Sequence, residues 1–252
     1  MKIPQAVLRE LFGHREFSVI DKVIYLVAAI CLPNSLAELC AQARVSRSAT
    51  LRACRHLARL GWMVLVKTGK RIRPVAVVPY QYQTKMAQDL ERLYRLVGNK
   101  GEFLMKRYLD LRICSDEFID NARPEFLVNP MTDELLEYDR YYMSRVAFEF
   151  NGPQHHSTTK AFPDEKALKK IKTRDLVKRA LSDKAGVKLI TITAQDLRPD
   201  ALGRRIPDDL PLNPIDDGGP YFKALARICS AYADKATRPS DAEQPVKAGA
   251  KK

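Results

Sequence analysis

Apolar residues in the first quarter of the chain recur with the spacing of amphipathic helices. Residues 18–30, SVIDKVIYLVAAI, place apolar side chains three and four positions apart. Ser35 is suited to cap a short helix, LAELCAQA, and Ser46 to cap a longer one, RSATLRACRHLARLG, which ends at Gly61. The pattern therefore predicts three successive helices, the last two joined by a tight turn.

The spacing changes after Gly61. The stretches WMVLV and RPVAVV, joined by KTGKRI, indicate two strands of a hairpin with a basic tip. The next stretch, YQYQTKMAQDLERLYRLVGNK, returns to helical spacing, and Gly98 ends it. We interpret this segment as a helix that connects two domains.

Two helices at a tight turn followed by a basic hairpin resemble a winged helix-turn-helix domain. The resemblance covers about 60 residues and rests on pattern. It implies that the helix lies in a DNA major groove, while the hairpin touches phosphates or an adjacent minor groove. The residues that it assigns to DNA are Arg47, Ser48, Thr50, Arg52 and Arg55 on the helix, and Lys67, Lys70, Arg71 and Arg73 on the hairpin. Winged helices also serve as protein–protein modules, and that alternative stays open.

The charge of the chain supports a nucleic-acid partner. The 252 residues carry a formal net charge of +13, and residues 1–80 hold 13 Lys and Arg against 4 Asp and Glu. Such a surface attracts polyanions, although a basic protein without a nucleic-acid partner remains an alternative.

No stretch of the sequence is long and apolar enough to predict a membrane span. The longest apolar run is VIYLVAAICL, and the N-terminus lacks the apolar core of a secretory signal. Five cysteines form no CxxC pair, and Cys31, Cys40 and Cys54 lie among apolar helical positions. They are expected to be buried thiols in a reducing compartment. We therefore expect a cytoplasmic protein without a membrane partner.

A strand in the second half of the chain carries polar residues on one face. In VAFEFN, Val146–Asn151, the alternation places Glu149 and Asn151 side by side. LLEYDRYY, residues 135–142, is a second strand whose short link makes it an antiparallel neighbour. Asp139 and Glu149 could then converge and bind a hard cation such as Mg²⁺. Taken alone, the pattern fits a hairpin with ordinary surface acids equally well.

The order of motifs after residue 98 favours the cation site. GEFLMKRYL, RPEFLVNP, LLEYDRYY, VAFEFNGPQHH and KTRDLVKRALSDKAGVKLITI follow one another. This order resembles the restriction-endonuclease-like nucleases, the PD-(D/E)XK superfamily. The branch is that of the very-short-patch repair and homing-endonuclease-associated nucleases, in which E-x-N/D-G-x-Q-H is common. The resemblance covers roughly residues 99–197 and implies a mixed β-sheet flanked by helices, an α+β or α/β fold.

The resemblance also implies roles for individual residues. Glu102, Asp139, Glu149 and the backbone carbonyl of Phe150 would hold Mg²⁺ or Mn²⁺. The lysine that usually follows the second acid by two positions is absent, and Asn151 stands there. Gln154 is a stand-in for that lysine, and either the metal alone or His155 would activate water.

The helix that follows this strand adds a basic face. Arg174 and Lys178 lie four residues apart, so they are predicted to share a face and clamp the phosphate backbone. A solvated basic face is the alternative. GVKLITI predicts a buried central strand. His155 and His156 lie next to each other with no cysteine nearby, so a structural zinc site is not expected.

The sequence therefore predicts four parts: a winged-helix domain (1–80), a connecting helix (81–98), a nuclease domain (99–232) and a disordered basic tail (233–252). The function that it favours is a divalent-metal-dependent endonuclease acting on double-stranded DNA. A homodimer is compatible with this hypothesis. The alternatives are a non-catalytic DNA-binding regulator on a degenerate nuclease fold and an RNA-processing nuclease. A winged helix favours duplex DNA because A-form RNA hides its major groove.

Overall fold

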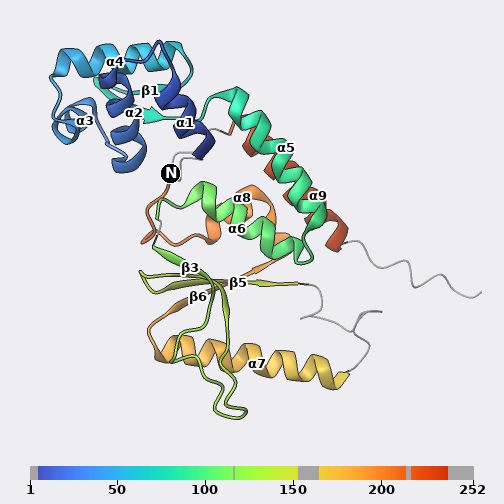
Figure 1. Ribbon diagram of the computed structural model, residues 1–252. Helices are drawn as coiled ribbons and strands as arrows, with labels where there is room; N and C mark the ends of the chain where they lie inside the picture. Colours follow the sequence, from blue (N-terminus) through green and yellow to red (C-terminus); the bar gives the residue numbers. More distant parts are fainter. Residues whose placement is uncertain (1–4, 116, 153–164, 214–216, 238–252) are drawn as a thin grey trace, which may run out of the picture. The chain divides into compact units, whose positions relative to one another are not determined.

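The computed structural model describes residues 5–115, 117–152, 165–213 and 217–237, which form a mixed α+β fold (Figure 1). The chain divides into two compact units. One comprises residues 1–119, 142–144 and 206–226, and the other residues 120–141, 145–205 and 227–252. This division differs from the predicted boundary near residue 98, because the helix that carries Glu102 belongs to the same unit as the N-terminal helices.

After α1 (Gln5–Gly13), which was not predicted, the N-terminal unit has helices and a two-stranded hairpin in the predicted order. These elements are α2 (Val19–Cys31), α3 (Leu36–Ala43), α4 (Arg47–Arg59), β1 (Met63–Thr68), β2 (Arg71–Ala76), α5 (Tyr80–Leu96) and α6 (Lys100–Arg112). The Ser35 and Ser46 side chains accept hydrogen bonds from Glu38 N and Ala49 N, as the caps predicted from the sequence require. Both strands reach two residues further into the turn than predicted, so only Gly69 and Lys70 remain there, and Gly69 has φ +60°.

The core of this unit is built around Trp62, which is 2% exposed. Its indole packs edge-on against the rings of Phe17 and Tyr25 at centroid distances of 5.3 Å each. A polar contact at the edge of this core joins α2 to α4. The buried Asp21 carboxylate accepts hydrogen bonds from Ser18, and His56 Nδ1 lies 3.2 Å from the same Asp21 Oδ2 atom. Together these contacts fix the orientation of α4 relative to α2.

A four-stranded sheet with the order β3-β4-β5-β6 follows α6 in the chain. Its strands are β3 (Phe118–Ala122), β4 (Tyr138–Tyr142), β5 (Val146–Asn151) and β6 (Lys188–Thr193). The strand predicted from GVKLITI to be buried and central is β6, which stands at the end of this order and is mostly half-buried. β5 and β6 are parallel, and α7 (Glu165–Lys184) lies between them in the sequence as the crossover that parallel strands require. The 3₁₀ helix η2 (Gln195–Leu197), α8 (Pro199–Arg205) and α9 (Pro220–Thr237) follow.

α7 covers one face of this sheet (Figure 1). Ala147 of β5 and Tyr138 of β4 pack with Val177 and Leu181 of α7 in one buried cluster. Phe150 points to the opposite face, where its ring meets Tyr232 of α9 at 6.1 Å. The predicted alternation of β5 is thus present, with Ala147 on the α7 face and Phe150 on the other.

The structure corrects several boundaries. β4 begins at Tyr138 because Leu135 pairs with Val128 in an isolated bridge outside the sheet. Residues 233–237, which we predicted to be disordered, are the last residues of α9, and residues 238–252 lie outside the described part.

Cys31, predicted to be buried, is exposed, because it ends α2 beyond the apolar stripe. Burial raises the pKa of the Cys54 and Cys229 thiols to about 12.

Among the described helices, none is by itself long and apolar enough to cross a membrane. α2 and α3 meet the length and composition criteria only as a pair bent by 111°. Ile24, Tyr25, Ala28 and Ala29 of α2 are buried in the core of the N-terminal unit.

Candidate functional site

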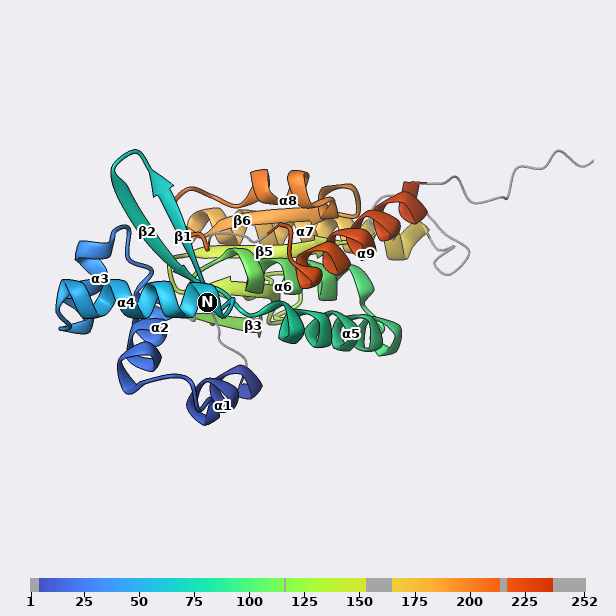
Figure 2. The ribbon, with the colours of Figure 1, turned by 90° about the horizontal axis from the view of Figure 1, so that it is seen from above.

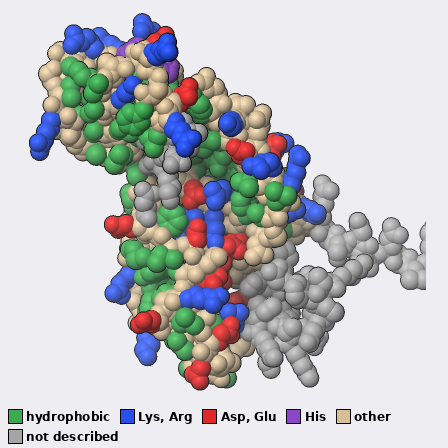
Figure 3. Space-filling view, viewed as in Figure 1, with side chains coloured by type: hydrophobic (Ala, Val, Ile, Leu, Met, Phe, Trp, Pro, Cys, Tyr) green, Lys and Arg blue, Asp and Glu red, His purple; other side chains and the backbone are tan. Residues whose placement is uncertain are grey.

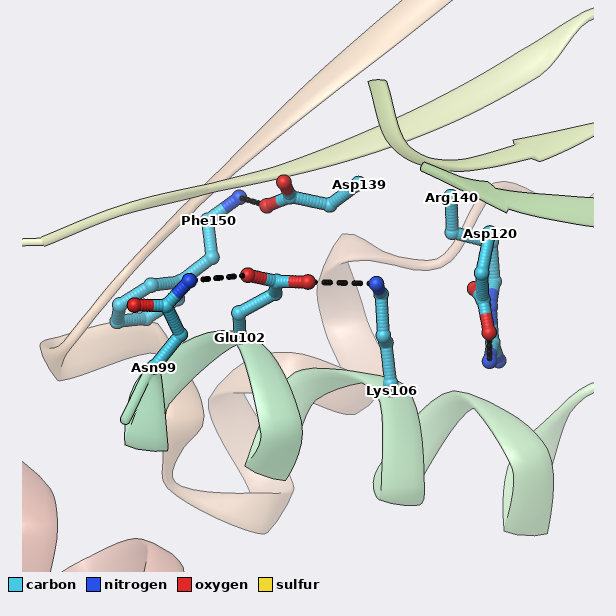
Figure 4. Close-up of polar contacts among 7 residues, drawn as sticks. All are labelled: Asn99, Glu102, Lys106, Asp120, Asp139, Arg140 and Phe150. Carbon is cyan, nitrogen blue, oxygen red and sulfur yellow. Dashed lines mark hydrogen bonds and ion pairs between the residues drawn. The ribbon is translucent and has the colours of Figure 1, made fainter. Parts of the chain in front are cut away.

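Asp139 and Glu149 are each hydrogen-bonded to the strand that carries the other. The Phe150 N–H of β5 donates to Asp139 Oδ2 at 2.7 Å, as Figure 4 shows. The Asp139 backbone N–H of β4 donates to the Glu149 carboxylate. The two acids that the sequence predicted to converge are therefore held at the same place along the β4–β5 pair.

Glu149 forms an ion pair with Lys178, which the sequence analysis did not predict. Lys178 Nζ donates to Glu149 Oε1, and the two side chains are 7% and 14% exposed. The second carboxylate oxygen, Glu149 Oε2, and the amide oxygen Asn151 Oδ1 are both buried, and neither has a hydrogen-bond partner within the described residues. We call Asp139, Glu149, Asn151 and Lys178 the β5 polar site.

Burial dominates the electrostatics of Glu149. Removal from solvent raises the pKa of the Glu149 carboxyl above its ordinary value, and the Lys178 ammonium opposes that shift. The nearby Asp175 carboxylate raises the pKa further, whereas the hydrogen bond from Asp139 N–H lowers it. The sheet therefore holds a carboxylate whose charge depends on a cation beside it.

The face of α7 that packs on the sheet brings the Lys178 ammonium to Glu149. Lys178 and Ser182 are four residues apart, and both side chains face the sheet, where the whole residues are 6% and 0% exposed. The Ser182 hydroxyl donates to the Lys178 carbonyl at 2.7 Å and is hydrogen-bonded to the Tyr138 hydroxyl. The contact between Tyr138 and Ser182 joins α7 to β4 at the turn of the helix next to Lys178, which pairs with Glu149.

The donors of the β5 polar site suit a hard divalent cation. Mg²⁺ takes carboxylate and amide oxygens, is bound through one or two carboxylates, and keeps several waters. Glu149 Oε2 and Asn151 Oδ1 are oxygens of this kind, and the loss of their hydration is not offset by any hydrogen bond from the described residues. Among those same residues, no group of three or more His, Cys, Asp or Glu side chains is arranged to hold a metal ion. A cation here would therefore need Asn151, backbone or water oxygens besides its acids.

The remaining predicted metal ligands have contacts of their own. Glu102, in the first turn of α6, accepts hydrogen bonds from Asn99 Nδ2 at 3.2 Å and from Lys106 Nζ (Figure 4). The Phe150 N–H is used by Asp139, and the role of the Phe150 carbonyl stays a prediction. Gln154 and His155 lie outside the described residues.

The predicted phosphate clamp on α7 takes a different form in the structure. Arg174 is exposed and pairs with Glu134 at 3.0 Å, whereas Lys178 is buried against Glu149. The two side chains do not form one exposed basic face. Four residues turn a helix by more than a full circle, so at the edge of the buried stripe Lys178 points inward while Arg174 does not.

Basic side chains gather on the outer surface of the N-terminal unit. Figure 3 shows Lys and Arg side chains along the edge formed by α4, and Figure 2 shows the β1–β2 hairpin extending beside α3 and α4. Most of the residues predicted to contact DNA are exposed: Arg47, Ser48, Arg52 and Arg55 on α4, and Lys67, Lys70 and Arg71 on the hairpin. Arg73 is half-buried, and its Nε has no hydrogen-bond partner among the described residues.

A groove joins the hairpin to the start of α3. Its volume is about 560 Å³, and it is lined by Arg47, Lys70 and Arg71 together with the cap residue Ser35 and Glu38. Three cations at the N-terminus of a helix favour anions, although Glu38 reduces the positive charge. The groove therefore brings one arginine at the start of α4 and two cations of the hairpin tip beside the N-terminal cap of α3.

Thr50 is the exception among the predicted DNA-contacting residues. It is 0% exposed, and its hydroxyl donates to the Val45 carbonyl at 3.4 Å. Thr50 shares the inner face of α4 with Ala53 and Leu57, so the helical repeat that packs the domain also turns Thr50 away from solvent. The prediction that Thr50 contacts DNA is wrong for this fold.

Comparisons with known proteins add one relative. Uncharacterized protein 094L of Frog virus 3 (isolate Goorha) is 36% identical over 91 residues, which are 34% of this chain. The matched part is 58% of that protein, so the chain spans less than two thirds of its relative's length. No protein-family profile matches the sequence, and no solved structure matches the fold.

Proposed function

We propose that this protein is a divalent-metal-dependent endonuclease that cleaves double-stranded DNA at the β5 polar site. The observation that carries the proposal is the pair of buried oxygens, Glu149 Oε2 and Asn151 Oδ1, without hydrogen-bond partners in the described part of the chain. They lie two residues apart on the strand that carries the nuclease-like motif. Burying polar oxygens without partners is costly, so the arrangement is best explained by a ligand that supplies the missing contacts.

Each residue of the site has a role in this proposal. Asp139, Glu149 and Asn151 would hold Mg²⁺ or Mn²⁺ through their oxygens. When bound, such an ion polarises a phosphodiester and lowers the pKa of a bound water. The hydrogen bond from Phe150 N–H orients the Asp139 carboxylate, and the Lys178 ammonium opposes the rise in the pKa of Glu149 that burial causes.

The exposed arginines of α4 and the cations of the hairpin would target the enzyme to duplex DNA. Arg47 and Arg52 lie in the first half of α4, where side chains of a helix in the major groove reach base edges. The hairpin tip would contact phosphates, because Lys70 and Arg71 are exposed and carry no predicted base contact.

A second candidate function is DNA binding without cleavage. The Glu149–Lys178 ion pair favours it, because a carboxylate already neutralised by a buried ammonium is a poorer ligand for a second cation. The same ion pair is compatible with cleavage if the cation displaces Lys178.

Digestion of supercoiled plasmid tests the proposal. We expect nicked or linear products with Mg²⁺ or Mn²⁺ and none with EDTA, because the site depends on a hard cation. Intact plasmid under all metal conditions, together with tight DNA binding, would establish the regulator instead. Cleavage of duplex RNA in preference to DNA would identify an RNA-processing nuclease.

A pair of variants on α4 tests how this helix meets DNA. Thr50→Val keeps the shape of the side chain and removes the hydrogen bond to Val45, so we expect a loss of about 0.5–1.5 kcal/mol in the free energy of unfolding and no change in DNA affinity. Arg47→Ala should do the reverse, with the stability unchanged and a loss of about 1–3 kcal/mol of discrimination between sequences. Thermal unfolding and fluorescence anisotropy on several duplexes measure the two effects. Equal weakening on every duplex would show that Arg47 contacts only phosphate.

A further inference from the structure

The ammonium group of Lys178 is paired with the carboxylate of Glu149, which the proposed function assigns to a metal ion. It comes from α7, 29 residues after Glu149, and is 7% exposed. Isolated buried charges are costly, and this ion pair reduces that cost for both partners. In the protein without metal, the pair therefore stabilises an acid that would otherwise be buried with an uncompensated charge.

A divalent cation at this site would weaken the ion pair between Lys178 and Glu149. Lys178 uses only Glu149 Oε1, and Oε2 has no hydrogen-bond partner among the described residues. A cation that binds Oε2 brings a second positive charge to the same carboxylate. The repulsion between this cation and the ammonium at such short range then weakens the ion pair. The flexible four-carbon side chain of lysine lets its ammonium move without any shift of the helix.

The negative charge of the substrate indicates where the Lys178 ammonium would move. A phosphodiester adds one negative charge to the site, and Asn151, which follows Glu149 by two residues, is neutral. Lys178 is the cation that the structure places beside the acid, so it can neutralise the phosphate when the metal takes over Glu149.

We propose that Lys178 is an exchangeable counter-ion, paired with Glu149 in the metal-free protein and released to the scissile phosphate when a divalent cation binds. This inference rests on the proposed nuclease function and adds to it a competition between Lys178 and the metal. In that competition, Lys178 lowers metal affinity and raises the rate of cleavage.

Lys178→Met in the full-length protein separates these two effects. Without the competing ammonium, Mn²⁺ affinity should increase at least about tenfold, because a like charge within a few ångströms has been removed. Mn²⁺ should also raise the midpoint of thermal unfolding by more than in the unsubstituted protein, since it now neutralises an unpaired acid. Plasmid cleavage should fall at least about 100-fold with the loss of the cation at the phosphate. Calorimetric titration with Mn²⁺, thermal unfolding with and without Mn²⁺, and plasmid digestion measure the three quantities.

Lys184→Met is the matched control, because Lys184 is an exposed lysine on the same helix. It should leave all three quantities unchanged. If Lys178→Met does not fold, Lys178→Gln keeps a hydrogen-bond donor for Glu149, and the same gain in Mn²⁺ affinity is expected.

The outcomes distinguish this inference from the proposed function. If the unsubstituted protein binds Mn²⁺ and cleaves DNA, but neither Lys178 variant gains Mn²⁺ affinity, the counter-ion exchange is wrong and the nuclease stands. If the unsubstituted protein neither binds Mn²⁺ nor cleaves, the nuclease and the exchange both fail. Tighter Mn²⁺ binding together with lost cleavage supports the exchange.

Discussion

Glu149→Gln is expected to lower plasmid cleavage at least about 10³-fold, which corresponds to about 4 kcal/mol of transition-state stabilisation. The amide keeps the size of the side chain and one oxygen for Lys178, but it has no charge with which to hold a divalent cation. DNA affinity should stay the same or increase, because a negative charge near the phosphate has been removed. Digestion rates at saturating Mn²⁺ and anisotropy titrations with the same duplex measure the two effects.

Asp139→Asn should give a comparable loss of cleavage. The asparagine oxygen can still accept the Phe150 N–H, so the contact between β4 and β5 is kept while the charge is lost. Glu137→Gln is the matched control, because Glu137 lies two residues before Asp139 and pairs with the exposed Arg123. Full activity of Glu149→Gln in a protein that cleaves DNA would place the active site elsewhere.

The triple change of Lys67, Lys70 and Arg71 to alanine is expected to weaken DNA binding most strongly at low salt. Each phosphate contact releases counterions and contributes about −0.9 to the slope of log affinity against log salt, so the slope should flatten by up to about three units. All three side chains are exposed on the hairpin and outside the hydrophobic core, so the stability of the unit should change little. Anisotropy titrations between low and physiological salt measure the slope.

The control for this triple variant removes the same charge from another element. Lys85, Arg92 and Arg95 are exposed on α5, and their change to alanine lowers the net charge by the same amount. We expect a smaller change in slope for this control. Charges on α5 would attract DNA only from a distance, where salt screens them, whereas the hairpin charges would contact phosphates directly. Equal slopes for the two triple variants would show that the hairpin has no special role in DNA binding.

Much of the fold could be predicted from the sequence, because its signals are local. Helical spacing and serine caps predicted α2, α3 and α4, and alternation predicted β5 with Ala147 and Phe150 on opposite faces. The α+β class follows from these elements and is confirmed. The strand β3 and the helix α1 were missed, since FIDNA has little apolar alternation and α1 is short. The helices α8 and α9 were not predicted either.

The candidate site was predicted only in part. Asp139 and Glu149 were identified from their motif, and the structure ties each of them to the strand of the other. Lys178 was identified as a basic residue on the correct helix but given the wrong environment. Its spacing from Arg174 indicates a shared face, and spacing alone does not say where the buried stripe ends. The structure shows that the stripe includes Ser182, four residues after Lys178, which is 0% exposed.

The sequence by itself determined the order of the elements, the basic character of the first quarter and the acids of the second half. These depend on residues close together in the chain, whose spacing and capping carry their own physical meaning. The tertiary structure decided that Thr50 faces the core, that Lys178 meets Glu149 and that two oxygens of β5 are buried without hydrogen-bond partners in the described residues. Burial and ion pairing join residues that are distant in sequence, so they depend on how α4 and α7 rotate as they pack. That rotation results from all the apolar contacts of each helix together, and no local pattern contains it.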